Sequence, residues 1–172
     1  MRAFALVPLL LAAACSGGSE APKQEETAAA QKLDAGQWEL TTEVTKFAKA
    51  DQGKPKIDTP EGTKETRTVC VEEADAAKPQ PAMFGGEKDE CTYGDFYMSD
   101  GRLSATVNCN RPGLSGNVAT RADVDFKAKS LEGTLSTTTY LTTDGDVQIS
   151  RKLTGRHTGQ CTAEPAGKEK KA

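Results

Sequence analysis

Residues 117–126 read NVATRADVDF, and every second residue from Val118 to Phe126 is apolar or small. The positions between them are mostly polar or charged. Strict alternation over this length is typical of a strand that turns one face to a core and the other to water. The stretch therefore predicts a half-buried antiparallel strand.

Three further stretches alternate in the same way: GQWELTTEV (36–44), LEGTLSTTTYL (131–141) and DVQISRKL (146–153). Their many threonines suit a pleated surface. The residues expected to face inward across all four stretches are Trp38, Leu40, Thr42, Val44, Val118, Thr120, Ala122, Val124, Phe126, Leu131, Leu135, Thr137, Thr139, Leu141, Val147, Ile149 and Leu153.

With TRTVCV, ECTYGDFYM and RLSATVNC the count reaches about seven strands, separated by turn signals such as SDG (99–101) and TDGD (143–146). Short turns between successive strands predict an all-β fold: a single antiparallel meander that curls into a barrel-like or two-layered sheet. Only EEADAAK looks helical, and Pro79 and Pro81 limit it to one short helix near 72–78.

The N-terminus carries an apolar run at residues 3–14. As a helix it would measure about 18 Å, too short for a hydrocarbon core of about 30 Å. It is typical of a cleaved signal peptide. Ala12, Ala13 and Ala14 followed by Cys15 resemble a bacterial lipobox, which predicts lipidation of Cys15 and stable anchoring by more than one acyl chain. Because Ser16 follows, and not Asp, we expect the outer membrane, with the protein facing the periplasm.

The polar residues 16–32 contain no large apolar side chain, and the C-terminal end is rich in lysine. We therefore expect four parts: 1–14 signal peptide, 15–34 lipidated Cys and flexible tether, 35–162 β-domain, and 163–172 disordered basic tail.

The formal net charge is −3, and removal of residues 1–14 makes it about −4 because Arg2 leaves with them. A weakly acidic chain has no electrostatic footprint for nucleic acid, and it offers no basic patch for anionic lipid. Nucleic acid is therefore not an expected partner, and the membrane contact is expected through the lipid.

Four cysteines remain after Cys15, and an even set in an oxidising compartment predicts two disulfides. If SDG is a three-residue connection, Met98 faces Arg102, Tyr97 faces Leu103, Asp95 faces Ala105, Tyr93 faces Val107 and Cys91 faces Cys109. This register favours the pairs Cys91–Cys109 and Cys70–Cys161. The pairs Cys70–Cys91 and Cys109–Cys161 remain the alternative. Reduction is expected to unfold or loosen the domain.

Catalytic chemistry finds little support. His157 is the only histidine, and it lacks a nucleophile in a suitable motif. The pairs Asp123/Asp125 and Asp144/Asp146 fit a solvated strand face and a turn better than a calcium site or a hydrolase. The cysteines lack the close spacing that zinc sites use. We expect no enzyme, no metal and no cofactor.

The hairpin tip GDFYMSDG carries Phe96, Tyr97 and Met98. In the assumed register Phe96 and Met98 face away from Tyr97, so one face of the tip is apolar and uncovered unless another layer packs there. These three residues are a possible contact surface.

Several segments together resemble a bacterial family of secreted proteins and lipoproteins known as domain of unknown function 3617. They are GQWEL, CVEEADA, CTYGDF, the hairpin SDGRLSATVNC and the ending GRHTGQC, over about residues 35–161. His157 stands where the family more often has a second arginine. The resemblance implies secretion and a disulfide framework, and it implies no activity.

We therefore expect a non-enzymatic envelope lipoprotein that serves as a binding or scaffold module in the periplasm. One form would carry a lipid or other hydrophobic small molecule in a β-sheet cavity, and a cavity under about 200 Å³ would count against it. The other would bind an envelope protein through Phe96, Met98 and an edge strand such as residues 36–47. A hydrolase is the remote alternative.

Overall fold

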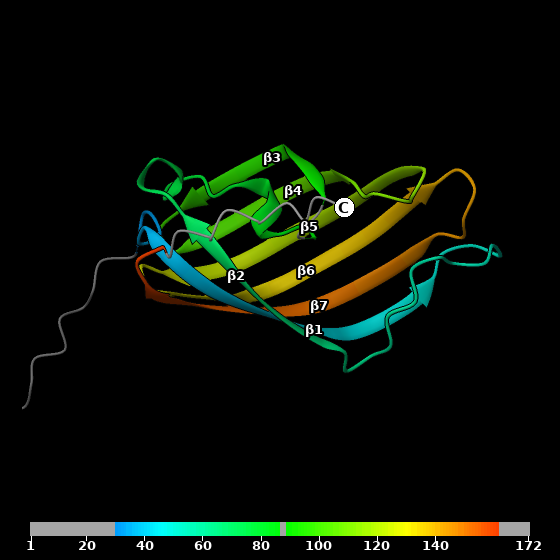
Figure 1. The fold of residues 1–172 in the computed structure, drawn as a ribbon, viewed down its shortest axis with the longest axis horizontal. Helices are drawn as coiled ribbons and strands as arrows, with labels where there is room; N and C mark the ends of the chain where they lie inside the picture. Colours follow the sequence, from blue (N-terminus) through cyan, green and yellow to red (C-terminus); the bar gives the residue numbers. More distant parts are fainter. Residues whose placement is uncertain (1–29, 87–88, 162–172) are drawn as a thin grey trace, which may run out of the picture.

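The computed structural model describes residues 30–86 and 89–161, and seven strands in this part of the chain form one antiparallel sheet. The order across the sheet is β2-β1-β7-β6-β5-β4-β3. The strands are β1 (Gly36–Lys49), β2 (Lys64–Val71), β3 (Glu90–Ser99), β4 (Arg102–Asn110), β5 (Gly116–Lys127), β6 (Ser130–Leu141) and β7 (Val147–Gly159). The predicted meander of about seven strands is confirmed. The sheet is bent but does not close into a barrel (Figure 1).

The two edge strands are β2 and β3. The predicted edge strand at residues 36–47 is therefore wrong, because β1 pairs with β2 on one side and with β7 on the other. Residues 72–86 follow β2 and lead toward β3, the strand at the other edge of the sheet. These residues are here called the covering segment. Together with β2, the covering segment lies in front of the sheet (Figure 1).

The short helix expected near 72–78 is present only as a 3-10 turn. The covering segment holds only two 3-10 turns, η1 (Glu73–Asp75) and η2 (Pro81–Met83). Pro79 and Pro81 lack the N–H groups that a longer helix would need. None of the helical turns among residues 30–86 and 89–161 has the length and apolar character to span a bilayer.

The β3–β4 hairpin is tighter than expected. Asp100 and Gly101 form a two-residue turn, with φ of 53° and 75°. Met98 therefore pairs with Leu103 and Tyr97 with Ser104, one place away from the predicted register. A bulge at Gly94 restores the register below it, so Tyr93 faces Val107 and Cys91 faces Cys109 as expected. The shift turns Phe96 and Met98 toward the core and Tyr97 toward water.

The predicted disulfides are confirmed. Cys91 pairs with Cys109 at a Cα–Cα distance of 4.1 Å, and Cys70 pairs with Cys161 at 5.5 Å. The second bridge fixes edge strand β2 to Cys161, two residues after the end of β7.

The apolar rows of the strands meet on the inner face of the bend, where they form two hydrophobic clusters. The larger cluster contains Trp38, Leu40, Leu103 and Val107 together with Met83 and Phe84 of the covering segment. The smaller cluster contains Val44, Val147 and Ile149. Almost all of the residues that the alternation predicts to face inward are buried in this layer.

Residues 30–34, which the sequence analysis places in the tether, lie against the end of the sheet. Leu33 is 1% exposed, and its N–H donates to the carbonyl of Ala76. The apolar side chain of Leu33 explains this placement, because its burial is favourable. The expected signal peptide, Cys15 and the basic tail at 163–172 lie outside the described residues.

Candidate functional site

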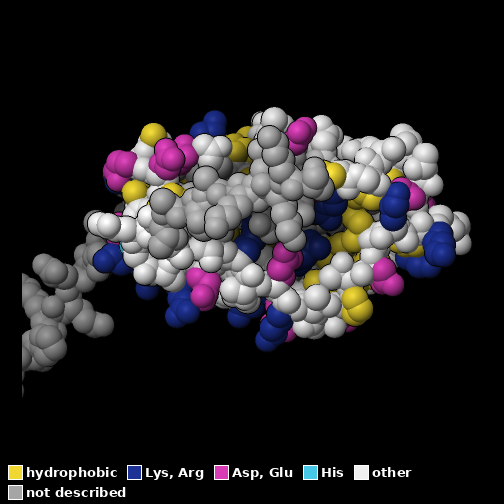
Figure 2. All heavy atoms as spheres, in the orientation of Figure 1, with side chains coloured by type: hydrophobic (Ala, Val, Ile, Leu, Met, Phe, Trp, Pro, Cys, Tyr) yellow, Lys and Arg dark blue, Asp and Glu magenta, His cyan; other side chains and the backbone are white. Residues whose placement is uncertain are grey.

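A pocket of about 440 Å³ opens on the inner face of the sheet. Its floor comes from β1, β7, β6 and β5, and its rim comes from β2, the covering segment and residues 111–112. In the space-filling view the described part of this face is hollowed, and Lys or Arg side chains lie beside hydrophobic ones in the hollow (Figure 2). The volume falls within the usual range for small-molecule sites, about 300–1,000 Å³.

The pocket lies where the two hydrophobic clusters meet. Val44 of the smaller cluster borders it on one side, and Leu135 and Phe84 of the larger cluster border it on the other. Between them the floor carries threonines. Thr120 and Thr137 face each other across β5 and β6, and their hydroxyl oxygens are 3.0 Å apart. The pocket is therefore apolar at its ends and polar in its middle.

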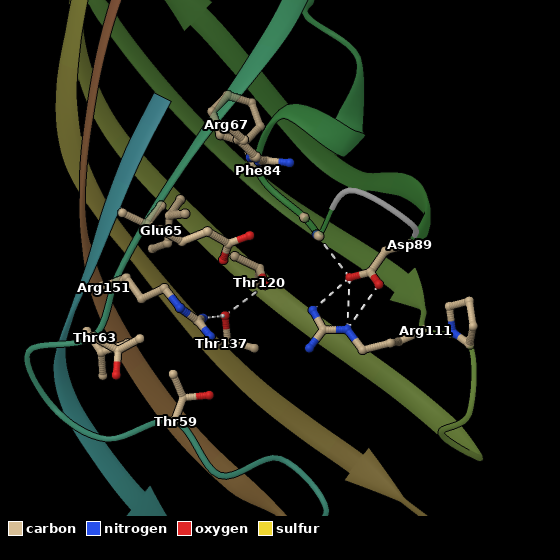
Figure 3. A pocket seen from close by; sticks show the side chains of 16 residues that line it. Thr59, Thr63, Glu65, Arg67, Phe84, Asp89, Arg111, Thr120, Thr137 and Arg151 are labelled. Atoms are coloured by element: carbon tan, nitrogen blue, oxygen red, sulfur yellow. Dashed lines mark hydrogen bonds and ion pairs between the residues drawn. The ribbon is translucent and has the colours of Figure 1, made fainter. Parts of the chain in front are cut away.

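Arg151 projects from β7 into this polar middle (Figure 3). It occupies the inward row between Ile149 and Leu153, where the alternation would place an apolar side chain. Its Nη1 donates to Oγ1 of Thr137 at 3.2 Å. Burial lowers the pKa of the Arg151 guanidinium from its ordinary value, and the positive charge of Arg111 lowers the pKa further.

Arg111 reaches the pocket from the opposite side, just after β4, and its guanidinium points toward that of Arg151 (Figure 3). It forms an ion pair with Asp89 at 2.8 Å, and its Nε also donates to the same carboxylate. The Asp89 side chain is only 4% exposed. Burial alone would raise the pKa of Asp89. The hydrogen bonds and charge of Arg111, helped by the N–H of Gly86, outweigh burial and hold that pKa below its usual value.

The covering segment is held over the pocket by polar contacts as well as by Met83 and Phe84. Arg67 of β2 donates to the carbonyls of Ala82 and Met83, at 3.0 and 2.6 Å. The hydroxyl of Tyr93 donates to the carbonyl of Pro79 at 2.6 Å, and burial raises the pKa of this phenol. The rim is thus bound to both edge strands.

The possible contact surface at the hairpin tip is divided by the register shift. The ring centroids of Phe96 and Tyr93 are 4.8 Å apart, and Met98 packs on the larger cluster. Tyr97 is 56% exposed on the opposite face. The structure therefore brings Phe96 and Met98 together with the core, and it leaves Tyr97 alone among the three on the outside.

His157 and the paired aspartates do not meet. The Nε2 atom of His157 lies 3.0 Å from the carbonyl oxygen of Ala35, near one end of β7, and its ring packs edge-on against Trp38. Asp146 lies just before the other end of β7, where its carboxylate accepts hydrogen bonds from Thr139 and Leu141. Asp123 binds Arg121 and Ser104 on the outer face. These residues have structural partners at separate places.

Asp89, Cys91 and Cys109 form the one group of three potential metal ligands that lie close together in the described part of the chain. Both sulfurs belong to the disulfide, and the carboxylate is paired with Arg111. A disulfide sulfur is not a thiolate, and only the thiolate is a good metal ligand.

The arginines of the pocket were not found by the sequence analysis. A signal for Arg151 was present, because a charged residue interrupts the inward row Val147, Ile149, Leu153. The sequence carried no comparable signal for Arg111 or Arg67, since their positions depend on the bend of the sheet and on the path of the covering segment.

Comparison with known proteins agrees with the resemblance noted in the sequence. Residues 33–161 match the family model described as Protein of unknown function (DUF3617). No curated protein and no solved structure matches the chain. The matched range contains all seven strands, both disulfides and the pocket. The chain therefore belongs to the DUF3617 family.

Proposed function

We propose that this protein is a non-enzymatic binding module of the bacterial envelope, lipidated at Cys15, that holds an amphipathic small molecule in the pocket of the inner face. The observation that carries the proposal is the pocket itself: about 440 Å³, apolar at both ends and polar in its middle. A cavity under about 200 Å³ would count against carriage of a small molecule, and this pocket has more than twice that volume. The volume therefore favours carriage of a small molecule over a protein-contact role.

The chemistry of the lining supports binding without catalysis. Its polar groups are threonine hydroxyls, arginines and two carboxylates, Glu65 and Asp89. Asp89 is occupied by Arg111, and a general base needs a free site within hydrogen-bond reach of a substrate proton. His157 packs against Trp38 and Ala35, and it is not part of the lining.

The location is proposed from the sequence. A short apolar leader followed by Ala12–Cys15 predicts lipid anchoring, with the outer membrane facing the periplasm as the favoured site. Incorporation of labelled palmitate that is lost in Cys15→Ala supports this part. Equal incorporation in both proteins refutes it.

The binding role is tested with N-phenylnaphthylamine, an uncharged probe that fluoresces in apolar surroundings, on the full-length chain carrying Cys15→Ala. Thr42→Phe, which fills the pocket from β1, should weaken probe binding by about tenfold. The matched control is Thr41→Phe on the opposite face of the same strand, where Thr41 bonds Thr66. No probe binding to the parent chain, or equal loss in both variants, contradicts the proposal.

A further inference from the structure

The charge within the pocket points to the kind of ligand it takes. Among the described residues, the charged side chains that line it are Arg67, Arg111, Arg151, Glu65 and Asp89. A partly buried charge is costly unless a partner compensates it.

Arg151 is the residue whose charge is not matched by a neighbour. Among the ion pairs formed by residues 30–86 and 89–161, none includes Arg151, and its hydrogen bond goes to the neutral hydroxyl of Thr137. Arg111, the nearest cation, already has Asp89. Glu65 attracts both arginines across the pocket but forms no ion pair with either.

Strand β7 directs the side chain of Arg151 to the inner face of the sheet and not to the outer surface of the protein. Its Cα lies in a row whose neighbours, Ile149 and Leu153, are 2% and 0% exposed. Arginine on the outer face would reach water, as Arg156 of the same strand does while pairing with Glu39. A cation held in the inner row, beside Thr137 and facing open pocket volume, is placed to meet something that enters the pocket.

We infer that the pocket takes an amphiphile whose head is a carboxylate, and that Arg151 binds this head while the tail lies against Leu135 and Phe84. The inference rests on the proposed function. A carboxylate carries one negative charge, which equals the single positive charge of Arg151, and it fits the planar guanidinium in a bidentate contact. A phosphate monoester carries nearly two negative charges, more than the one charge of Arg151 compensates.

The experiment compares three probes of equal chain length, decanoate, decanol and decyl phosphate, by displacement of N-phenylnaphthylamine from the full-length chain carrying Cys15→Ala. Decanoate should bind about tenfold more tightly than decanol, since a charge-assisted hydrogen-bond pair contributes at least this factor. Arg151→Gln should remove the preference while leaving the decanol affinity within about twofold. Arg156→Gln, on the same strand but paired with Glu39 outside the pocket, should keep it.

Arg151→Lys is the control for misfolding of Arg151→Gln. It keeps the positive charge, so it should keep part of the preference for decanoate over decanol. Equal affinity for decanoate and decanol in the parent chain overturns the inference, as does a preference that survives Arg151→Gln. Tighter binding of decyl phosphate than of decanoate also overturns it. If the uncharged probe binds and Thr42→Phe weakens its binding, the proposed function stands even when the carboxylate preference fails.

Discussion

Gly85 lies directly against Cys91: a Cβ atom at residue 85 would be 2.5 Å from Sγ of Cys91 and 2.9 Å from Sγ of Cys109. The covering segment passes over the β3–β4 disulfide at this point. Real Cβ contacts are not that short, so the segment can follow this path only because residue 85 has no side chain. The Cys91–Cys109 disulfide therefore has two roles. It joins β3 to β4, and it limits how closely the covering segment at the pocket rim can approach the sheet.

Gly85→Ala should lower the free energy of unfolding by about 1–3 kcal/mol, the usual cost of overpacking a tight contact. Urea denaturation measures it. The control is a double-mutant cycle with Cys91→Ala/Cys109→Ala, in which the methyl group no longer meets two sulfurs and the cost should shrink. An equal cost in both backgrounds shows that the clash with the sulfurs is not the cause.

The two disulfides should differ in their contribution to stability. In the chain-entropy model a separation of 91 residues contributes about 4.5 kcal/mol and one of 18 residues about 3 kcal/mol. Cys70→Ala/Cys161→Ala should therefore reduce the free energy of unfolding more than Cys91→Ala/Cys109→Ala does, as measured by denaturation of each double variant. The reverse order would mean that residual structure in the unfolded chain, and not loop length, sets the effect.

Arg151→Gln should leave the domain as stable as the parent or raise the free energy of unfolding by up to about 1 kcal/mol. The physical reason is that Arg151 is a half-buried cation hydrogen-bonded to a neutral hydroxyl, and that burial and the repulsion of Arg111 outweigh the attraction of Glu65. Thermal melting followed by circular dichroism measures this. A marked loss of stability would show that Arg151 is needed by the fold and would weaken its assignment to a ligand.

Asp89 should give the domain a stability that is lost in acid. Its pKa is lowered in the folded state, so the contribution is present above the unfolded pKa of about 3.9 and disappears as the pH falls through the folded pKa. Asp89→Asn should cost about 1–3 kcal/mol at neutral pH, because Arg111 loses its charged partner. The variant should also lose less stability than the parent when the pH is lowered from about 5 to below the folded pKa.

Denaturation at several pH values tests this prediction, with the exposed Asp95→Asn as control. Parallel pH curves for the parent and Asp89→Asn, offset by a constant, would contradict it.

The hairpin tip offers a test that separates packing from contact. Phe96→Ser should destabilise the domain by about 2 kcal/mol, since Phe96 packs on Tyr93 and the larger cluster. Tyr97→Ser should change stability by no more than about 0.5 kcal/mol, because the side chain is 56% exposed. A partner lost from pull-downs with Tyr97→Ser alone would revive the contact surface. A partner lost only with Phe96→Ser would reflect misfolding.

The alternation at residues 117–126 and in the three similar stretches determined the strands, the inward rows and the antiparallel meander. Period-two patterning is a local property, and one buried face is enough to specify it. The sequence also favoured the cysteine pairing that the structure shows, although the assumed turn was one residue too long and the alternative pairing stayed open. The β-bulge at Gly94 shifts the strand by one residue, so the register at Cys91 is the predicted one. The sequence shows the glycine, but it does not show that the strand bulges there.

The tertiary structure alone decided the pocket. Arg151, Arg111, Asp89 and Glu65 come from β7, the residue after β4, the residue before β3, and β2, and no sequence spacing brings them together. They meet because the sheet bends and the covering segment joins its two edges across the inner face. That bend sums small twists over seven strands, so it depends on the packing of the whole domain and cannot be read from any one stretch.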